Sequence, residues 1–309
     1  MRKTVMIFGI SSFVGSNLAE ILKNDFRVVG TYHKTPVNIP GVTCYHCDVH
    51  KKDYIQKLIA IVKPDFTIYA IGLSSLAECR QRPKLADALN SVGAANVCSA
   101  SERFRSKFIY LSSGFVHSGD NLTFTEGDTP FPNTAFGTSL SSAEFYIQRS
   151  CLNYLILRLG NIYGRGYRDQ HPNWFEGLER ALSRGEKFVA DDSVKMGFLD
   201  IQIIARILKK AVDENVTNRL MHVSSADLMT RYQFAQSYAR HFKFDVSLIQ
   251  SSVVTFPLER KLGKDAVQDF TYRLSVANIE EFLGTKMPSI DESLTFTKKR
   301  LEIFSEKSS

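Results

Sequence analysis

The sequence has no long hydrophobic run and few cysteines. Its longest apolar stretches fall well short of the ~20 residues that a membrane helix needs. Its five cysteines are an odd number in a chain of 309 residues, so we expect reduced thiols and no disulfide framework. The first strand is predicted to follow Met1 almost directly, which leaves no room for a signal peptide. We therefore expect a soluble, intracellular protein of the cytoplasm without a membrane partner.

Charge of one sign is not concentrated either. The net charge is +7, but the chain has no long Lys/Arg run and no repeat of basic and aromatic residues. A moderate positive excess suits an anionic small ligand such as a nucleotide, and it also fits charge dispersed over the surface. We expect no nucleic-acid partner.

Two kinds of site lack the residues they need. Cys44, His46 and Cys47 are close in sequence, but on a strand Cys47 faces away from the other two. No second Cys-x-x-Cys completes a zinc site, and no Gly-x-Ser-x-Gly elbow of a serine hydrolase occurs. The sequence therefore predicts no metal centre and no hydrolase triad.

The N-terminal stretch 4–22 is predicted to form a strand, a tight turn and a helix. Residues 4–8 are an apolar run typical of a strand buried on both faces. Gly9 allows a sharp turn, and Gly15 allows the helix to pack close to the strand. A helix N-terminus at such a turn suits a pyrophosphate, although a turn of this type without a ligand is the alternative. The expected contacts with a dinucleotide cofactor are Gly9, Ser11, Ser12, Phe13, Val14 and Gly15.

Strands and helices alternate up to residue 160. Strands are predicted at 26–32, 42–47, 66–71, 107–112 and 154–159, helices at 55–62, 82–101 and 135–148, and a polar loop at 114–133. This alternation predicts parallel βαβ units with ligands at the C-terminal ends of the strands. The fold class is therefore α/β, a Rossmann-type doubly wound parallel sheet, with residues 1–160 as its NAD(P)-binding domain.

The pattern loosens after residue 160. Helices are predicted at 174–182, 201–212 and 232–241, and a last helix begins near Ser289. Thr230 with Gln233, and Ser289 with Glu292, have the spacing of capping boxes. Residues 161–309 are predicted to form a smaller α/β substrate-binding lobe, with the alternative that segments near 187–215 return to the sheet.

Short motifs then follow one another in a fixed order. They are the turn 9–15, Cys47-Asp48-Val49, Ala70-Ile71-Gly72, Asn90-x-x-Gly93, Leu111-Ser112-Ser113-Gly114 and Arg158-Leu159-Gly160-Asn161-Ile162-Tyr163-Gly164. In this order and spacing the chain resembles the extended short-chain dehydrogenase/reductase superfamily. It looks closest to the branch of the dTDP-4-dehydrorhamnose reductases and the regulatory subunit of methionine adenosyltransferase. The resemblance implies cofactor contacts from Asp48, Val49, Ala70, Gly72 and Asn90, and a nucleotide-linked sugar as the substrate.

Basic residues add an expectation for the substrate. Arg158, Arg165, Arg168 and Lys195 fall in segments that would line a cleft between the lobes, where sugar-nucleotide enzymes hold a second diphosphate. A solvated basic surface is the alternative. With Asn161 of the motif above, Arg158, Arg165 and Lys195 are the predicted substrate contacts. A homodimer is left open.

The catalytic pair of that superfamily is missing. Its chemistry rests on Tyr-x-x-x-Lys, where the lysine on the same helix face lowers the pKa of the tyrosine for proton transfer. Counted from the Pro130-x-Pro132 loop, Phe136 stands at the tyrosine position and Leu140 at the lysine position, while Ser113 keeps the catalytic Ser/Thr position. Two hypotheses follow. The protein is an oxidoreductase or epimerase with a replacement acid, or it is a catalytically inactive, cofactor-binding regulatory protein. The candidate acids are Ser112, Ser113, His117, Thr138, Tyr163 and Lys195.

The end of the second strand predicts which cofactor binds. NAD-specific folds place an acidic residue there to accept the ribose 2′-hydroxyl. This chain has Tyr32-His33-Lys34 instead, and a cationic Lys34, helped by His33, suits a 2′-phosphate. The sequence therefore predicts NADP(H) in preference to NAD(H).

Overall fold

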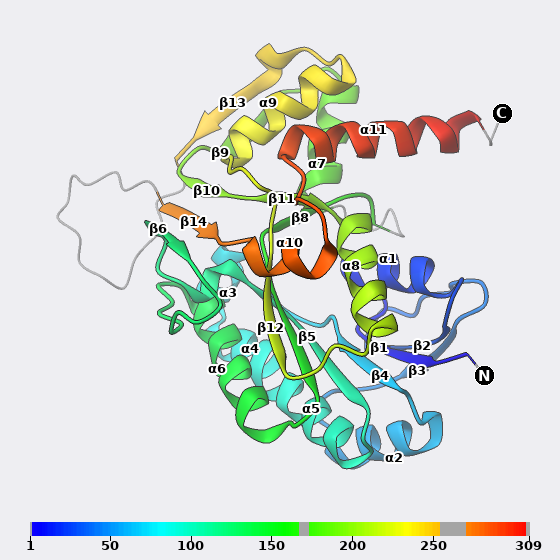
Figure 1. Cartoon of the computed structure of the whole chain (residues 1–309). Coiled ribbons are helices and arrows are strands. Elements are labelled where there is room, and N and C mark those ends of the chain that lie inside the picture. The colour runs from blue at the N-terminus through cyan, green and yellow to red at the C-terminus, as the bar shows by residue number, and fades with distance from the viewer. Residues whose placement is uncertain (1, 167–172, 254–269, 307–309) are drawn as a thin grey trace. The chain divides into compact units, whose positions relative to one another are not determined.

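The computed structural model describes residues 2–166, 173–253 and 270–306 (Figure 1). The chain forms two compact units, each made from separate stretches. The first contains Met1–Ser118, Thr129–Leu159 and Gln202–Met221, and the second contains Gly119–Asp128, Gly160–Ile201 and His222–Ser309. This arrangement differs from a single boundary at residue 160, because 119–128 join the second unit and 202–221 return to the first.

The first unit is built on a seven-stranded sheet in the order β12-β7-β5-β4-β1-β2-β3. Its strands are β1 (Thr4–Phe8), β2 (Arg27–Tyr32), β3 (Thr43–His46), β4 (Phe66–Tyr69), β5 (Lys107–Ser113), β7 (Tyr154–Leu159) and β12 (Arg219–Val223). The neighbouring pairs from β7 through to β3 are parallel. The chain crosses from β3 at one edge of the sheet back to β4, which lies beside β1. The strand order therefore reverses between β1 and β4, and a doubly wound sheet binds its ligand at this switch point. The predicted Rossmann-type fold is confirmed.

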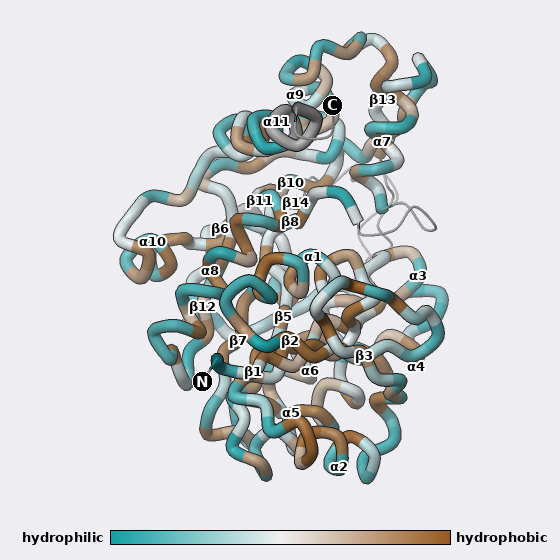
Figure 2. The backbone as a smooth tube through the Cα atoms, turned by 90° about the vertical axis from the view of Figure 1, so that its right-hand side faces the viewer, coloured by the Kyte–Doolittle hydropathy of each residue, from teal (hydrophilic) through white to brown (hydrophobic). Residues whose placement is uncertain are grey.

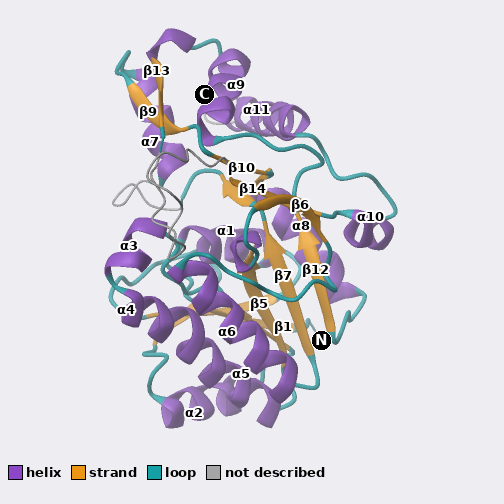
Figure 3. Cartoon of the chain, turned by 90° about the vertical axis from the view of Figure 1, so that its left-hand side faces the viewer, coloured by secondary structure: helices purple, strands orange, loops and turns teal. Residues whose placement is uncertain are grey.

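Helices cover both faces of this sheet. α2 (Lys52–Val62), α5 (Gly93–Arg103) and α6 (Ala135–Ser150) lie on one face, and α1 (Phe13–Leu22) and α8 (Ile201–Asp213) lie on the other (Figures 2 and 3). The apolar residues of β1 and β4 are fully buried between the layers. These two central strands are buried along their whole length, as expected for parallel strands covered on both faces.

The predicted helix 82–101 is divided. α3 (Leu76–Gln81) and α4 (Pro83–Asp87) precede a turn of π-helix, η1 (Ala88–Val92), which leads into α5. Side chains bind three successive carbonyls of this region: His50 Nε2 lies 3.1 Å from Ala88 O, Tyr69 Oη donates to Leu89 O at 2.5 Å, and Tyr110 Oη donates to Asn90 O at 2.9 Å. These bonds from neighbouring elements satisfy the carbonyls of the widened turn.

The predicted loop 114–133 also contains regular structure. It holds a short 3₁₀ turn, η2 (Gly114–Val116), and a strand, β6 (Asp120–Phe124). β6 pairs with β14 (Phe270–Leu274) of the second unit. Its partner comes from a distant part of the chain, so local sequence gave no sign of this strand.

Three small sheets and a group of helices make up the second unit. The strand pairs are β8 (Asn161–Tyr163) with β11 (Phe198–Asp200), β9 (Phe188–Asp191) with β13 (Ile249–Ser252), and β14 with β6 and β10 (Val194–Met196). The helices are α7 (Trp174–Ser183), η3 (Val246–Leu248), α9 (Arg231–Phe242), α10 (Ala277–Leu283) and α11 (Ile290–Glu306).

Aromatic rings fill the core of this second unit. Phe198 and Phe234 stack with their ring centroids 4.5 Å apart, and Tyr163 and Trp174 pack against Phe234 at 4.9 and 5.3 Å. Aromatic contacts of this kind stabilise a core beyond the area they bury.

Both predicted capping boxes are confirmed. Thr230 and Gln233 cap α9 reciprocally, and Ser289 and Glu292 exchange the same pair of bonds before α11. Among the described residues, no helix combines the length and apolar character that crossing a membrane requires.

Candidate functional site

Two glycines determine the shape of the turn between β1 and α1. Gly9 has a positive φ of +89°, a conformation that glycine adopts without strain. A side chain on Gly15 would collide with the carbonyl oxygen of Gly9, so the start of α1 lies directly against the end of β1. Phe13 and Val14 are the first helical residues, and the N–H groups of a first turn have no acceptor within their helix. The start of α1 therefore offers backbone N–H groups of the kind that suit a pyrophosphate.

Ser12 fastens this turn from within. Its hydroxyl caps α1 by accepting the N–H of Gly15 at 2.9 Å, and it donates to Ala70 O at 3.0 Å. We expected this hydroxyl to serve a phosphate, but its donor proton is used by the loop after β4. Ser12 thus joins the C-terminal ends of β1 and β4, and Ser11 lies next to it in the turn.

The loop after β4 is fixed by Asn90, which is 1% exposed. The Asn90 side chain accepts from Leu73 N at 2.8 Å and donates to Leu73 O at 3.1 Å and Ser139 Oγ at 2.9 Å. A side chain on Gly72 would come within 2.9 Å of Asn90 Oδ1. The amide of Asn90 is therefore hydrogen-bonded within the protein, where it positions the loop that follows Gly72.

The ends of β2 and β3 form a polar edge. His33 and Lys34 follow β2 and are exposed, and the His33 ring lies 5.6 Å from the ring of His46 at the end of β3. Asp48 Oδ1 accepts the backbone N–H of His50 at 2.9 Å, a bond that lowers the pKa of Asp48. Val49 is buried in the core beside it. Asp48 is therefore a charged acceptor at this edge, and Val49 is part of its apolar support.

The positions predicted to be catalytic lie close to the start of α6. Ser113 ends β5, and its Oγ donates to Leu159 O at 3.3 Å. A side chain on Gly137 would collide with the carbonyl oxygen of Phe115, so the first turn of α6 lies against the segment that follows Ser113. The ring of Phe136 packs edge-on against Phe115 at 5.8 Å. Ser113 and Phe136 are thus brought to neighbouring segments of one unit.

Leu140 lies deeper in the same helix. It is 5% exposed and belongs to the hydrophobic core between the sheet and the helices α5 and α6, against which Phe136 also packs. Neither side chain carries a proton that can be transferred at neutral pH. At these two positions the helix presents an apolar surface.

A buried ion pair one turn further along α6 was not predicted. Arg158 on β7 donates to Glu144 through Nη2 at 2.8 Å and through Nε at 3.1 Å, and both side chains are at most 2% exposed. Ser112 Oγ donates to Glu144 Oε1 at 2.5 Å, and His117 Nε2 lies 3.3 Å from Arg158 Nη1. We expected Arg158 to line a substrate cleft, but its guanidinium is buried together with the carboxylate of Glu144. The spacing of Phe136, Leu140 and Glu144 in steps of four was the available signal for Glu144.

Most of the other candidate acids are hydrogen-bonded within the protein. Ser112 and His117 belong to the buried pair just described, and Thr138 Oγ1 donates to Thr134 O on its own helix at 3.0 Å. Tyr163 is buried in the second unit with its hydroxyl 2.7 Å from Ser293 Oγ, and burial raises its pKa. Tyr163 is thus unsuited to proton exchange, and Ser113 is the candidate that keeps a weakly held hydroxyl.

The remaining predicted substrate contacts lie in the second unit. Arg165 Nε donates to Glu179 Oε2 at 2.9 Å, a bond that raises the pKa of Arg165. Its side chain is still 59% exposed. Asn161 begins β8, and Lys195 lies in β10 with partial exposure. The predicted residue Arg168 lies outside the described residues.

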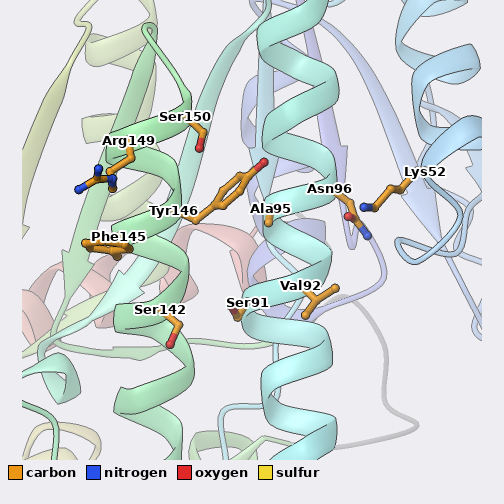
Figure 4. Close-up of a pocket in the computed structure, with 10 residues that line it drawn as sticks. All are labelled: Lys52, Ser91, Val92, Ala95, Asn96, Ser142, Phe145, Tyr146, Arg149 and Ser150. Carbon is orange, nitrogen blue, oxygen red and sulfur yellow. The ribbon is translucent and has the colours of Figure 1, made fainter.

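A groove of about 570 Å³ lies on the face of the first unit that α2, α5 and α6 cover (Figure 4). It runs between α2, η1, α5 and α6, and Tyr146 points across it from α6 toward Ala95. Lys52 and Arg149 are its charged lining residues. None of the predicted cofactor residues lines it. In the described ranges, no three or more His, Cys, Asp or Glu side chains gather as a metal site.

The sequence of the chain matches a known protein family over nearly its whole length. The pattern of the RmlD substrate binding domain matches residues 2–302, nearly the whole chain. The chain belongs to this family. This family match confirms the resemblance to the extended short-chain dehydrogenase/reductase superfamily that the motifs predicted.

Two curated relatives span most of this RmlD-family chain. The probable low-salt glycan biosynthesis reductase Agl14 of Haloferax volcanii is 24% identical over 293 residues, covering 93% of this chain and 95% of the relative. Methionine adenosyltransferase 2 subunit beta of Danio rerio is 21% identical over 292 residues, covering 93% of this chain and 87% of the relative. The RmlD-family chain is thus similar both to a reductase and to an enzyme subunit.

Solved structures share the fold over nearly the full length. A dTDP-4-dehydrorhamnose reductase of Bacillus anthracis in complex with NADP superposes with a TM-score of 0.78 at 19% identity, covering 96% of this chain and 98% of that one. A UDP-glucose 4-epimerase of Thermotoga maritima with UDP-glucose gives 0.76 at 17% identity, covering 96% and 99%. At this level of identity the likeness shows a common fold.

Proposed function

We propose that this RmlD-family protein binds NADP(H) at the turn between β1 and α1. The supporting observation is the glycine cradle at the switch point of the sheet, where Ser12 joins the ends of β1 and β4. Phe13 and Val14 then hold the pyrophosphate through their backbone N–H groups, with Asp48 at the adenine side. The Bacillus anthracis reductase that superposes on this fold carries NADP, and another neighbour, an enzyme of Bordetella bronchiseptica, carries NAD+.

The preference for NADP(H) rests on the end of β2. No carboxylate takes the NAD-specific position there, and Lys34 supplies a cation for a 2′-phosphate. Lys34→Glu is expected to weaken NADPH binding and to leave NADH binding nearly unchanged, as measured by fluorescence titration. Equal affinity of the wild type for the two cofactors would contradict the preference.

We propose further that the protein acts on a nucleotide-linked sugar as a reductase or epimerase with altered proton transfer. Its relatives and fold neighbours include a glycan biosynthesis reductase, a dTDP-4-dehydrorhamnose reductase and an epimerase with UDP-glucose. When bound, the nicotinamide supplies or accepts the hydride. Ser113 is the group of this chain that is placed to hydrogen-bond a reacting oxygen, and Arg165, Asn161 and Lys195 are proposed as substrate contacts.

The apolar pair on α6 sets the expected rate. General acid–base assistance is worth about 10²–10⁴-fold, and Phe136 and Leu140 provide none. Hydride transfer to ordinary family substrates is therefore expected to be slow, with Ser113 as the remaining polar group.

A regulatory role is the second candidate. The packing of Phe136 and Leu140 into the core favours a regulatory role, because the core is well packed at the two positions where the proton donor and its lysine are missing. The similarity to methionine adenosyltransferase 2 subunit beta points the same way. In this role the protein binds cofactor and performs no turnover.

Binding and turnover measured together separate the candidates. NADPH and NADH are titrated first, and NADPH oxidation is then followed with a panel of nucleotide-linked 4-keto sugars. Turnover that falls in Ser113→Ala supports the enzyme, and binding without turnover supports the regulatory role. Loss of all dinucleotide binding would overturn both.

Variants at the missing pair sharpen this experiment. Phe136→Tyr restores the phenol, and Phe136→Tyr with Leu140→Lys restores the full pair, so turnover is expected to rise most in the double variant. Because Leu140 is buried, the melting temperature is measured in parallel to separate a folding defect from a catalytic one. Fast wild-type turnover that survives Ser113→Ala would contradict the assignment of Ser113.

A further inference from the structure

Two histidines stand side by side at the edge of the sheet where β2 and β3 end. The strands run parallel, with Tyr32 opposite His46. The rings of His33 and His46 have centroids 5.6 Å apart at an interplanar angle of 38°, and Tyr32 lies edge-on to His46 at 5.9 Å. His33 and His46 are both exposed. The end of the second strand is the place where this type of fold distinguishes NADP from NAD.

Charged groups flank the pair on both segments. Lys34 follows His33 on the same segment, and Asp48 and His50 follow β3. The backbone N–H of His50 lowers the pKa of Asp48, with smaller contributions from the His50 and His33 side chains. His50 is held by Asp48 Oδ1 at 3.0 Å and by Ala88 O at 3.1 Å, so it is not directed at the pair. Asp48 therefore carries a negative charge that can balance one imidazolium.

We propose that His33 and His46 bind the 2′-phosphate of NADP in a protonation-dependent manner, so that the preference for NADP over NAD increases as the pH falls. This inference rests on the proposed cofactor binding and adds a specificity device to it. Lys34 provides a fixed charge, and the two histidines provide a variable one.

The reason lies in what each imidazole can donate. A neutral imidazole has one N–H, whereas the protonated ring has two and a positive charge. Two neighbouring imidazolium rings repel each other, and a phosphate dianion removes that penalty. Binding of the phosphate is therefore favoured when the pair carries protons.

The test compares NADP+ with NAD+, which differ only in the 2′-phosphate. Affinities are measured by calorimetric titration at pH 6.5 and at pH 8.5. The affinity for NADP+ divided by that for NAD+ is expected to be about tenfold lower at pH 8.5, the effect of about one charge-assisted hydrogen bond. The 2′-phosphate keeps most of its second charge throughout this range. Titrations in buffers of different ionisation enthalpy are expected to show proton uptake with NADP+ and none with NAD+.

Variants identify the responsible groups. His33→Gln and His46→Gln are expected to flatten the pH dependence of the ratio, and His46→Arg is expected to keep high NADP+ affinity while reducing the dependence. His241→Gln is the matched control, since His241 lies on α9 in the second unit with Nδ1 on Ser237 O at 2.9 Å. Loss of the dependence in His50→Gln but not in the pair would contradict the assignment.

The outcomes separate this inference from the proposal beneath it. If neither dinucleotide binds, the proposed cofactor function fails. If both bind and their affinity ratio stays constant with pH, the cofactor function stands and the histidine mechanism is overturned.

Discussion

A methyl group at Gly15 would overlap the carbonyl oxygen of Gly9, where β1 turns into α1. Gly15→Ala must therefore displace either the strand end or the first turn of the helix. We expect at least a tenfold loss of dinucleotide affinity, since a loss of ~1.4 kcal/mol is enough for it, measured by titration with NADPH.

The control for this change is another helical glycine. Gly177 lies in α7, and a side chain there would meet only Phe188 at 3.8 Å, an ordinary contact. Gly177→Ala is expected to leave binding intact and to raise stability by up to about 1 kcal/mol. Equal binding by both variants would show that the cofactor does not use the turn.

Lys107 is a buried lysine whose charge the fold tolerates poorly. It is 2% exposed, and burial lowers its pKa to about 8, with a contribution from the nearby Lys3. Between this pKa and the ordinary value near 10.5, the unfolded chain holds a proton that the folded chain has released. Stability contributed through Lys107 is therefore expected to rise with pH across roughly pH 8 to 10.5.

Urea unfolding at pH 7.5, 9 and 10.5 measures this effect. The unfolding midpoint of the wild type is compared with that of Lys107→Met, in which the increase should be smaller. The Nζ atom also donates to Asn215 and Val216 near the end of α8, so the variant loses these bonds at every pH. An identical pH profile in both proteins would contradict the assignment to Lys107.

At the scale of elements, α6 is fastened to β7 by the pair Glu144–Arg158. Removing one partner of a buried pair leaves an uncompensated charge and destabilises by about 3–5 kcal/mol. Arg158→Met is expected to cost that much, whereas the double variant Glu144→Leu/Arg158→Met should cost clearly less. Chemical denaturation of the wild type, both single variants and the double variant gives the coupling energy. Additive effects would show that the two side chains do not depend on each other.

The sequence predicted those elements whose signal is local. The turn 9–15 and the capping box at Thr230 follow from residues a few positions apart, and the structure contains them. Asn90 was assigned to the cofactor from the family resemblance, and Arg158 was assigned to the substrate because guanidinium groups suit phosphate oxygens. Their actual partners, Leu73 and Glu144, become neighbours only when β4, β5, α6 and β7 assemble. The pairing of β6 with β14 was not predictable for the same reason.

At the scale of the whole molecule, the cysteines give a direct test of the fold. All are free thiols, and Cys47, Cys79, Cys98 and Cys151 are buried whereas Cys44 is partly exposed. Burial raises the pKa of Cys47 to about 12 and that of Cys79 to about 11, which suppresses the reactive thiolate. A thiol reagent at pH 7.5 is expected to modify Cys44 first in the native protein and all five cysteines after denaturation. Rapid native modification of Cys98 or Cys151 would contradict the packing of α5 and α6.

The order of the strands has a consequence for synthesis on the ribosome. β7 and β12 are neighbours in the sheet, yet Gly160–Ile201 between them belong to the second unit. While these residues are being translated, a nascent sheet that ends at β7 exposes the backbone groups of an unpaired edge, which favours pairing with other chains. The first unit thus reaches its full sheet only after most of the chain has been made, and a fragment released at residue 160 would keep its open edge permanently.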